Sequence, residues 1–188
     1  MRPTLFFSVQ PVQLCPETVD NVSSARRTGK RKVVSVDQLD VRLVALLNEE
    51  PRIGVLECSR RLNVARGTVQ ARLDRLVARG VITGFGPEID PAALGYDVTA
   101  FVTLQIRQVS GHEPLADRLG RIPEVLEVHT ITGSGDMLCR IVARNNADLQ
   151  RVIDLIVDLH GVMRTESVIA LDTPVPYRTL PLVRAAQR

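Results

Sequence analysis

The stretch from Val64 to Gly84, VARGTVQARLDRLVARGVITG, combines arginines, small residues and a regular apolar spacing. Four apolar residues fall at i, i+4, i+7 and i+8, namely Val69, Leu73, Leu76 and Val77. This spacing predicts a helix with one apolar face, and it leaves small residues and arginines on the other side. Small residues let a helix backbone approach a partner closely, and guanidinium groups bind phosphates or guanine edges. A helix that lies in the major groove of DNA needs this chemistry.

Six residues of this helix are the predicted DNA contacts. Arg72 and Arg75 are the leading candidates, with Thr68 and Gln70 near base edges and Arg66 and Arg79 at the DNA backbone. For an isolated helix the simpler interpretation is a solvated polar face opposite an apolar stripe. The surrounding sequence has to decide between the two interpretations.

The charge distribution favours the nucleic-acid interpretation. The net charge is only +3, but from Arg26 to Gly80 there are 13 Lys and Arg against 6 Asp and Glu. From Val81 to Arg188 the balance reverses, with 10 basic residues against 13 acidic ones. Positive charge gathered at one end of the chain supplies the salt-sensitive part of nucleic-acid affinity.

Two further helices precede the arginine-bearing one. Asp37 is a predicted N-cap of the first, Asp40 favours its positive end, and Pro51 ends it. The second runs from about Gly54 to Leu62, and Asn63 can adopt the left-handed conformation of a tight turn. Three short helices with such a turn predict a helix-turn-helix.

After Gly80 the period of the apolar residues changes. A brief strand is expected around residues 81–85, followed by elements in the order β-α-β-β-α-β. Their expected ranges are 98–107, 112–121, 125–132, 137–143, 147–159 and 162–171. This order is typical of a ferredoxin-like domain, in which two helices cover one face of an antiparallel sheet. We expect a second copy of the chain to cover the other face.

Gly133, Ser134, Gly135 and Asp136 join two of these strands and form a candidate small-molecule site. Glycine amides can bind a carboxylate, and the carboxylate of Asp136 can accept from an ammonium group. Met137 could shape an apolar side-chain pocket. A plain hairpin turn explains the same spacing, since Gly-x-Gly-Asp is common turn chemistry.

An ordered series of motifs resembles the Lrp/AsnC, or feast/famine, transcription regulators from about Val36 to Leu182. The motifs in the first half are the Asp37 to Leu47 pattern, Pro51-Arg52, Thr68-Val69, Arg72-Leu73, Arg75-Leu76, GVITGF at 80–85 and DPAALG at 90–95. The second half supplies PEV at 123–125, TGSGD at 132–136 and Gly161-Val162. At the entrance of the arginine-bearing helix, Ala65 replaces the family's usual serine, so a side-chain N-cap is expected to be absent.

The resemblance implies an α+β protein with an N-terminal winged-type helix-turn-helix and a C-terminal ferredoxin-like βαββαβ domain. It implies double-stranded DNA as a partner and an amino acid or related small molecule as an effector, which shifts assembly or DNA affinity. It favours the effector role for residues 133–137. Dimers are expected, and an octamer of four dimers. The corresponding division is a basic tail at 1–34, a DNA-binding domain at 35–84, a linker at 85–96, an effector-binding and oligomerisation domain at 97–175 and a tail at 176–188.

Two other functions remain open on the sequence alone. Sirohaem decarboxylases resemble the family in fold, so a related enzyme is one alternative, although the arginine-rich helix argues against it. An architectural DNA-binding protein without an effector is the other. We find no catalytic constellation, no cofactor motif and no metal-ligand spacing, because the three cysteines and three histidines are scattered. With no membrane-length apolar run and no convincing secretory signal, a cytoplasmic protein is expected.

Overall fold

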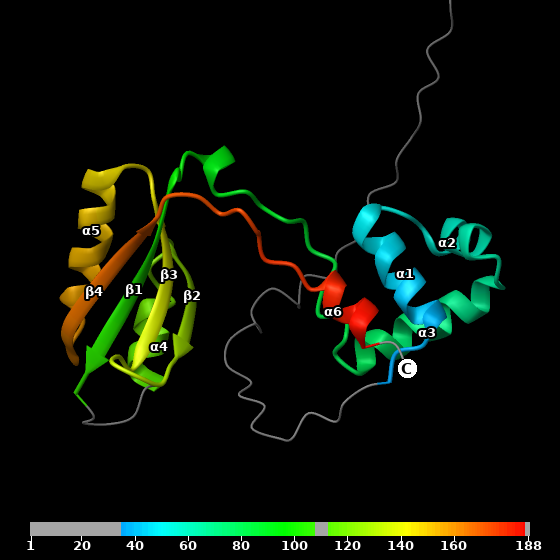
Figure 1. The fold of residues 1–188 in the computed structure, drawn as a ribbon, viewed down its shortest axis with the longest axis horizontal. Helices are drawn as coiled ribbons and strands as arrows, with labels where there is room; N and C mark the ends of the chain where they lie inside the picture. The colour runs from blue at the N-terminus through cyan, green and yellow to red at the C-terminus, as the bar shows by residue number, and fades with distance from the viewer. Residues whose placement is uncertain (1–34, 108–112, 187–188) are drawn as a thin grey trace, which may run out of the picture.

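The computed structural model describes residues 35–107 and 113–186, without the side chains of Glu113 and Pro114. The predicted tail at 1–34 lies outside these residues. The first half of the described chain is a three-helix unit of α1 (Gln38–Glu49), α2 (Val55–Leu62) and α3 (Arg66–Ala78) (Figure 1).

Local sequence signals set the ends of these helices. Asp37 and Asp40 form a capping box, in which each side chain accepts a hydrogen bond from the other residue's backbone N–H. Asn63 ends α2 in the left-handed region, with φ of 54°, and turns the chain into α3. Ala65 starts α3 without a side-chain cap, as predicted. The predicted helix-turn-helix is therefore confirmed.

The apolar side of α3 differs from its prediction at Val77. Val69 and Leu76 are buried in the core between the helices, but Val77 is 44% exposed. Because eight residues make 2.2 turns, Val77 is rotated by about 80° from Val69. The prediction of Val77 as part of the buried stripe is wrong.

The strand predicted around residues 81–85 is also wrong. Gly80 has φ of +69°, and the amides of Val81 and Ile82 then donate to the carbonyl of Leu76. The side chains of Val81 and Ile82 pack against the helical core. These apolar residues close the end of α3 instead of pairing in a sheet.

The second half of the chain has the predicted ferredoxin-like topology. Its elements are β1 (Val98–Ile106), α4 (Glu113–Leu119), β2 (Val125–Thr130), β3 (Met137–Ala143), α5 (Asn146–Val157) and β4 (Val162–Ala170). The strands form one antiparallel sheet in the order β2-β3-β1-β4. The expected bounds differ by a few residues, and the expected helix start at position 112 lies outside the described part.

One face of this sheet forms the core with both helices. Ala100, Val102 and Leu104 of β1 alternate toward that face and are fully buried. They pack in one cluster with residues of β3, α4 and α5. On the opposite face Phe101 pairs in register with Val168, and both are exposed.

Two segments join the halves of the molecule (Figure 1). The first leaves α3 and includes a 3-10 turn, η1 (Ala92–Leu94), whose first amide donates to Asp90 Oδ1 at 3.0 Å. The second leaves β4 and ends in α6 (Leu180–Ala185), which contacts α1. The sequence predicted only a tail there. No helix in the described ranges is long and apolar enough to cross a membrane.

The loop between β2 and β3 is fixed against β1. The Asp136 amide donates to Leu104 O at 2.8 Å, and Gln105 Nε2 donates to Ser134 O at 2.7 Å. Gly135, within this loop, is buried. A Cβ atom on Gly135 would overlap Thr103 Cγ2 and lie 3.3 Å from Leu104 O. The absence of a side chain at position 135 is therefore a packing requirement.

We predict that Gly135→Ala lowers the free energy of unfolding by about 1–3 kcal/mol, the usual cost of overpacking. Adding Thr103→Ser removes the overlapping methyl group and should recover most of that loss. Gly67→Ala is the matched control, because a Cβ there meets nothing within 4 Å and helix propensity favours alanine. Chemical unfolding measures all three, and a Gly135→Ala variant as stable as the parent would contradict the packing argument.

Candidate DNA interface and effector loop

The exposed face of α3 consists of three small residues and one acidic residue. Gly67, Ala71, Asp74 and Ala78 follow one another at helical spacing, and all four are exposed. The opposite side of α3 carries the buried residues Val69 and Leu76. A partner can therefore approach the backbone of α3 closely from the solvent side.

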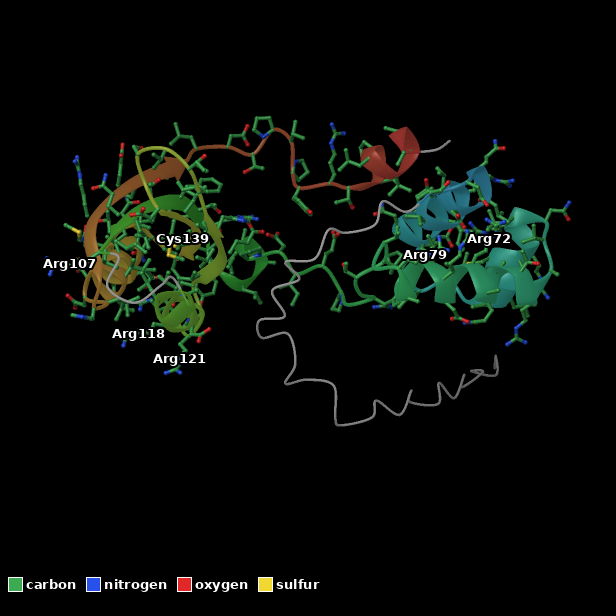
Figure 2. All side chains as sticks on the ribbon, turned by 90° about the horizontal axis from the view of Figure 1, so that it is seen from below. Arg72, Arg79, Arg107, Arg118, Arg121 and Cys139 are labelled. Atoms are coloured by element: carbon green, nitrogen blue, oxygen red, sulfur yellow. The ribbon has the colours of Figure 1, made fainter. Side chains whose placement is uncertain are left out.

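Four of the predicted DNA contacts border this face and are exposed: Arg66, Thr68, Gln70 and Arg79. Gln70 Nε2 donates to Asp74 Oδ1 at 2.8 Å, so Asp74 orients the side-chain amide of Gln70. Figure 2 shows Arg72 and Arg79 together on the helical unit, well apart from Arg107, Arg118 and Arg121 of the other half.

The other two predicted contacts, Arg72 and Arg75, are bound to acidic residues of α1. Arg72 Nη1 donates to Asp37 Oδ2 and, at 3.0 Å, to Asp40 Oδ1. Arg75 Nη2 donates to Asp40 Oδ2 at 2.5 Å. We call these four residues the Asp–Arg cluster. They join the N-terminus of α1 to the middle of α3, across 32 to 35 positions of sequence.

Burial makes the cluster a strong constraint. The Asp40 side chain is 0% exposed, while those of Arg72 and Arg75 are 25% and 37% exposed. A buried carboxylate needs compensating charge and hydrogen bonds, and Asp40 has two guanidinium partners besides the Asp37 amide. The hydrogen bond from Arg72 is the main reason that the pKa of Asp37 lies below its ordinary value of 3.8. The same contact raises the pKa of Arg72.

The sequence indicated the residues of the cluster but not their pairing. Asp37 is the predicted N-cap and Asp40 is predicted to favour the positive end of α1, and in the structure both take part in the capping box. The arginines are predicted as DNA contacts. A D-x-x-D spacing before one apolar stripe and an R-x-x-R spacing within another are the only signals of this pairing. Neither spacing says that the two helices cross where these residues meet.

The predicted effector loop holds Asp136 against the end of β1. Asp136 Oδ2 accepts from the Ile106 amide at 2.8 Å, next to an irregularity in the β1–β4 register at Gln105 and Ile106. Gly133 has φ of +119°, Ser134 is exposed and Gly135 is buried. Met137 is 2% exposed and belongs to the core between sheet and helices. In this structure its side chain faces that core rather than the surface of the loop.

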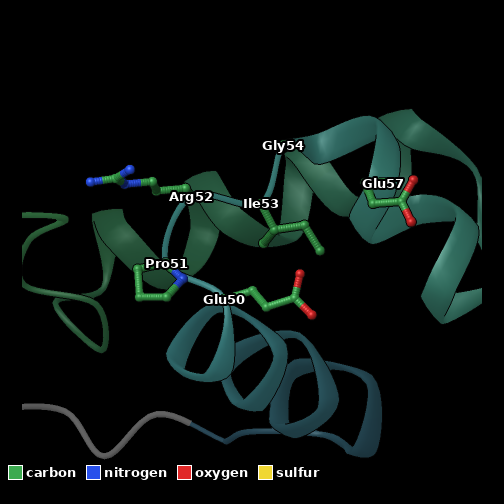
Figure 3. Close-up of a pocket in the computed structure, with 6 residues that line it drawn as sticks. All are labelled: Glu50, Pro51, Arg52, Ile53, Gly54 and Glu57. Atoms are coloured by element: carbon green, nitrogen blue, oxygen red, sulfur yellow. The ribbon is translucent and has the colours of Figure 1, made fainter.

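A shallow hollow of about 530 Å³ lies where the chain passes from α1 to α2 (Figure 3). Its lining residues are Glu50, Pro51, Arg52, Ile53, Gly54 and Glu57. Both glutamates are paired with Arg61, at 2.5 Å for Glu50 and 3.4 Å for Glu57. The Glu50–Arg61 pair links the end of α1 to α2, whereas the Glu57–Arg61 pair lies within α2. We therefore interpret these ion pairs as structural contacts at the surface.

The described cysteines are buried in the two cores. Cys58 packs in the helical unit and Cys139 in the sheet domain. Burial raises the pKa of the Cys139 thiol to about 11, and that of Cys58 is also raised. Both cysteines therefore act as small apolar core residues. Within residues 35–107 and 113–186, no group of three or more His, Cys, Asp or Glu residues is arranged to hold a metal ion.

The lowered pKa of Asp37 predicts an acid-dependent contribution to stability. Asp37→Asn keeps a good N-cap and removes the charge that binds Arg72. Because the folded-state pKa of Asp37 lies below the ordinary 3.8, this contribution is fully present above the ordinary pKa and is lost as the pH falls through the lowered folded-state pKa. The melting temperature of Asp37→Asn should therefore be below that of the parent at pH 7, and the gap should close in acid.

Arg72→Ala provides the control for this prediction. In an Arg72→Ala background, Asp37→Asn should have no such pH-dependent effect, because the partner of the charge is gone. A difference in melting temperature between Asp37→Asn and the parent that stays the same from pH 7 into acid would contradict the proposed ion pair.

Two family models match the two halves of the chain. The AsnC-type helix-turn-helix domain matches residues 36–77, which contain α1 to α3. The Lrp/AsnC ligand binding domain matches residues 99–180, which contain the sheet with α4 and α5.

Individual proteins match over both halves. The HTH-type transcriptional regulator FL11 of Pyrococcus horikoshii is 32% identical over 149 residues, which cover 79% of this chain and 98% of that protein. The solved structure of AsnC from E. coli has a TM-score of 0.72 and 26% identity, covering 79% of this chain and 100% of that one. A feast or famine regulatory protein of M. tuberculosis, complexed with L-methionine, has a TM-score of 0.67 and 29% identity, covering 76% and 96%. With both domains matched in order, the chain belongs to the Lrp/AsnC family of DNA-binding transcription regulators.

Proposed function

We propose that the exposed face of α3 is the DNA-reading surface of this regulator. The observation that carries the proposal is the stripe of small residues bordered by hydrogen-bond donors. Gly67, Ala71 and Ala78 leave room for close approach to a groove, and Arg66, Thr68, Gln70 and Arg79 border them on the exposed side. The solvent-exposed arginines at the two ends of α3 are suited to phosphates, which fix the register of a helix on DNA.

The double variant Arg66→Ala/Arg79→Ala tests the phosphate contacts. On a duplex selected from a random pool with the parent protein, its affinity should fall at low salt. The slope of log affinity against log salt should also become less steep by about two, one for each lost contact. Arg118→Ala/Arg121→Ala removes the same charge from exposed positions of the sheet domain and is the matched control (Figure 2). An equal change of slope in the control variant would contradict the proposal that Arg66 and Arg79 contact DNA phosphates.

We propose that residues 133–136 bind a zwitterionic amino acid that modulates DNA binding. The loop offers backbone amides beside a carboxylate, the complementary groups for such a ligand. Within the described residues, the Ile106 amide is the one donor to Asp136, and it uses Oδ2. The related M. tuberculosis protein was solved with L-methionine, which supports an amino acid as the ligand class. Because Met137 is buried in the core, the proposed site rests on the four loop residues.

Asp136→Asn tests the effector site without removing the acceptor for the Ile106 amide. A panel of the common amino acids, assayed by thermal shift, should contain members that stabilise the parent. That stabilisation should disappear in Asp136→Asn, because the ammonium group loses its counter-charge. Asp117→Asn, which makes the same change of charge at an exposed position of α4 outside the loop, is the control. Stabilisation that survives Asp136→Asn excludes this role for the loop, and a panel without any effect on stability or DNA affinity favours an architectural protein.

We further propose that the open face of the sheet pairs with a second copy of the chain. Phe101, Leu126 and Val168 are exposed apolar residues of the sheet, and Phe101 and Val168 are neighbours on its open face. Octamers remain a prediction, as does a cytoplasmic location. We propose that the chain acts as a regulator without a catalytic step, which is supported by its similarity to proteins named as transcriptional regulators.

A further inference from the structure

The two central arginines of α3 share one carboxylate but occupy different places on the helix. Arg75 lies four residues after Ala71 and three before Ala78, both on the exposed stripe. Arg72 lies three residues after Val69 and four before Leu76, both in the core. Arg75 therefore borders the DNA-reading surface, and Arg72 borders the buried side.

Their contacts differ in the same sense. Both hydrogen bonds of Arg72 leave from Nη1, one to each aspartate, so this end of its guanidinium is held between two residues of α1. Arg75 has a single carboxylate partner, Asp40, through Nη2. A guanidinium carries five N–H donors in a rigid plane, so one bond at Nη2 orients the group while other donors remain.

We propose that Asp40 is a positioning residue for DNA recognition: it aims the guanidinium of Arg75 at a base edge, while Arg72 locks α1 to α3 and does not touch DNA. This proposal rests on the proposed function, in which α3 reads DNA. The oriented edge of Arg75 matches the paired acceptors of guanine, O6 and N7. Because Asp40 is fully buried, its own contribution to sequence choice passes through Arg75.

Lysine substitutions separate the two arginines most sharply, since lysine keeps the charge but loses the planar donor pair. The measured quantity is the specificity ratio, the affinity for the selected duplex divided by the affinity for random duplex at one salt concentration. Arg75→Lys should lower this ratio about 5- to 150-fold, the range for one bidentate contact, and largely keep the affinity for random duplex. Arg72→Lys should change it by less than about twofold. If Arg72→Lys lowers the ratio as much as Arg75→Lys, the division of roles is refuted.

Asp40→Asn tests the positioning role directly, because asparagine has a similar shape without the charge. The single variant should lower the specificity ratio as Arg75→Ala does, and the double variant Asp40→Asn/Arg75→Ala should lower it no further. Additive losses would refute the action of Asp40 through Arg75. A merely structural role predicts a lower melting temperature in every Asp40 variant with an unchanged ratio. Should Asp40→Asn fail to fold, the comparison of Arg72→Lys with Arg75→Lys still tests whether only Arg75 contacts DNA.

The parent protein distinguishes this proposal from the proposed function. Absence of any preference of the parent for its selected duplex would mean that α3 does not read DNA. A clear preference in the parent, with equal losses for the two lysine variants, would leave the proposed function standing and refute only the inference on Asp40.

Discussion

The buried carboxylate of Asp40 is the constraint on which the helical unit depends. A charge removed from water must recover its solvation from the protein, and Asp40 recovers it from the Asp37 amide and two guanidinium groups. Removing one partner from a buried ion pair typically costs about 3–5 kcal/mol, because the remaining charge stays buried. A rotation of α3 about its own axis would move Arg72 and Arg75 away from Asp40 and break these contacts together. The cluster therefore fixes which face of α3 is exposed.

This constraint makes α1 the element that connects the parts of the molecule. Its N-terminus holds α3 through the Asp–Arg cluster, and its C-terminal end is linked to α2 by the Glu50–Arg61 pair. The helix α6, which follows the last strand of the sheet domain, contacts α1 as well. Helix α6 thus contacts the helix that orients the proposed DNA-reading surface.

The spacing of the apolar residues and the positions of turn and capping residues were enough to predict most of the fold. The change of spacing after Gly80 and the predicted turn residue Asn63 mark real ends of helices, and the order of elements in the second half predicted the ferredoxin-like sheet. Three features of the structure could not be predicted from the sequence, each for a physical reason. The rotation of Val77 out of the core depends on where α3 meets its neighbours, the pairing of the arginines depends on the α1–α3 crossing, and the six residues of α6 are too short to show a helical period.

The candidate sites show the same limit of sequence reasoning in two forms. In each, an aspartate of a recognisable motif carries a structural duty that its motif does not reveal. Asp40 caps α1 and holds two arginines, and Asp136 closes a hairpin and binds the amide of Ile106. A carboxylate has two oxygens with several lone pairs, so one group can accept hydrogen bonds from backbone and side chains together.

The two aspartates differ in burial, because Asp40 is fully buried while Asp136 is half-buried at the surface of a loop. Burial commits Asp40 to contacts within the protein, whereas the carboxylate of Asp136 is partly exposed. Charge type locates both candidate sites in the sequence, and only the packing around each carboxylate separates the proposed positioning group from the proposed ligand-binding one.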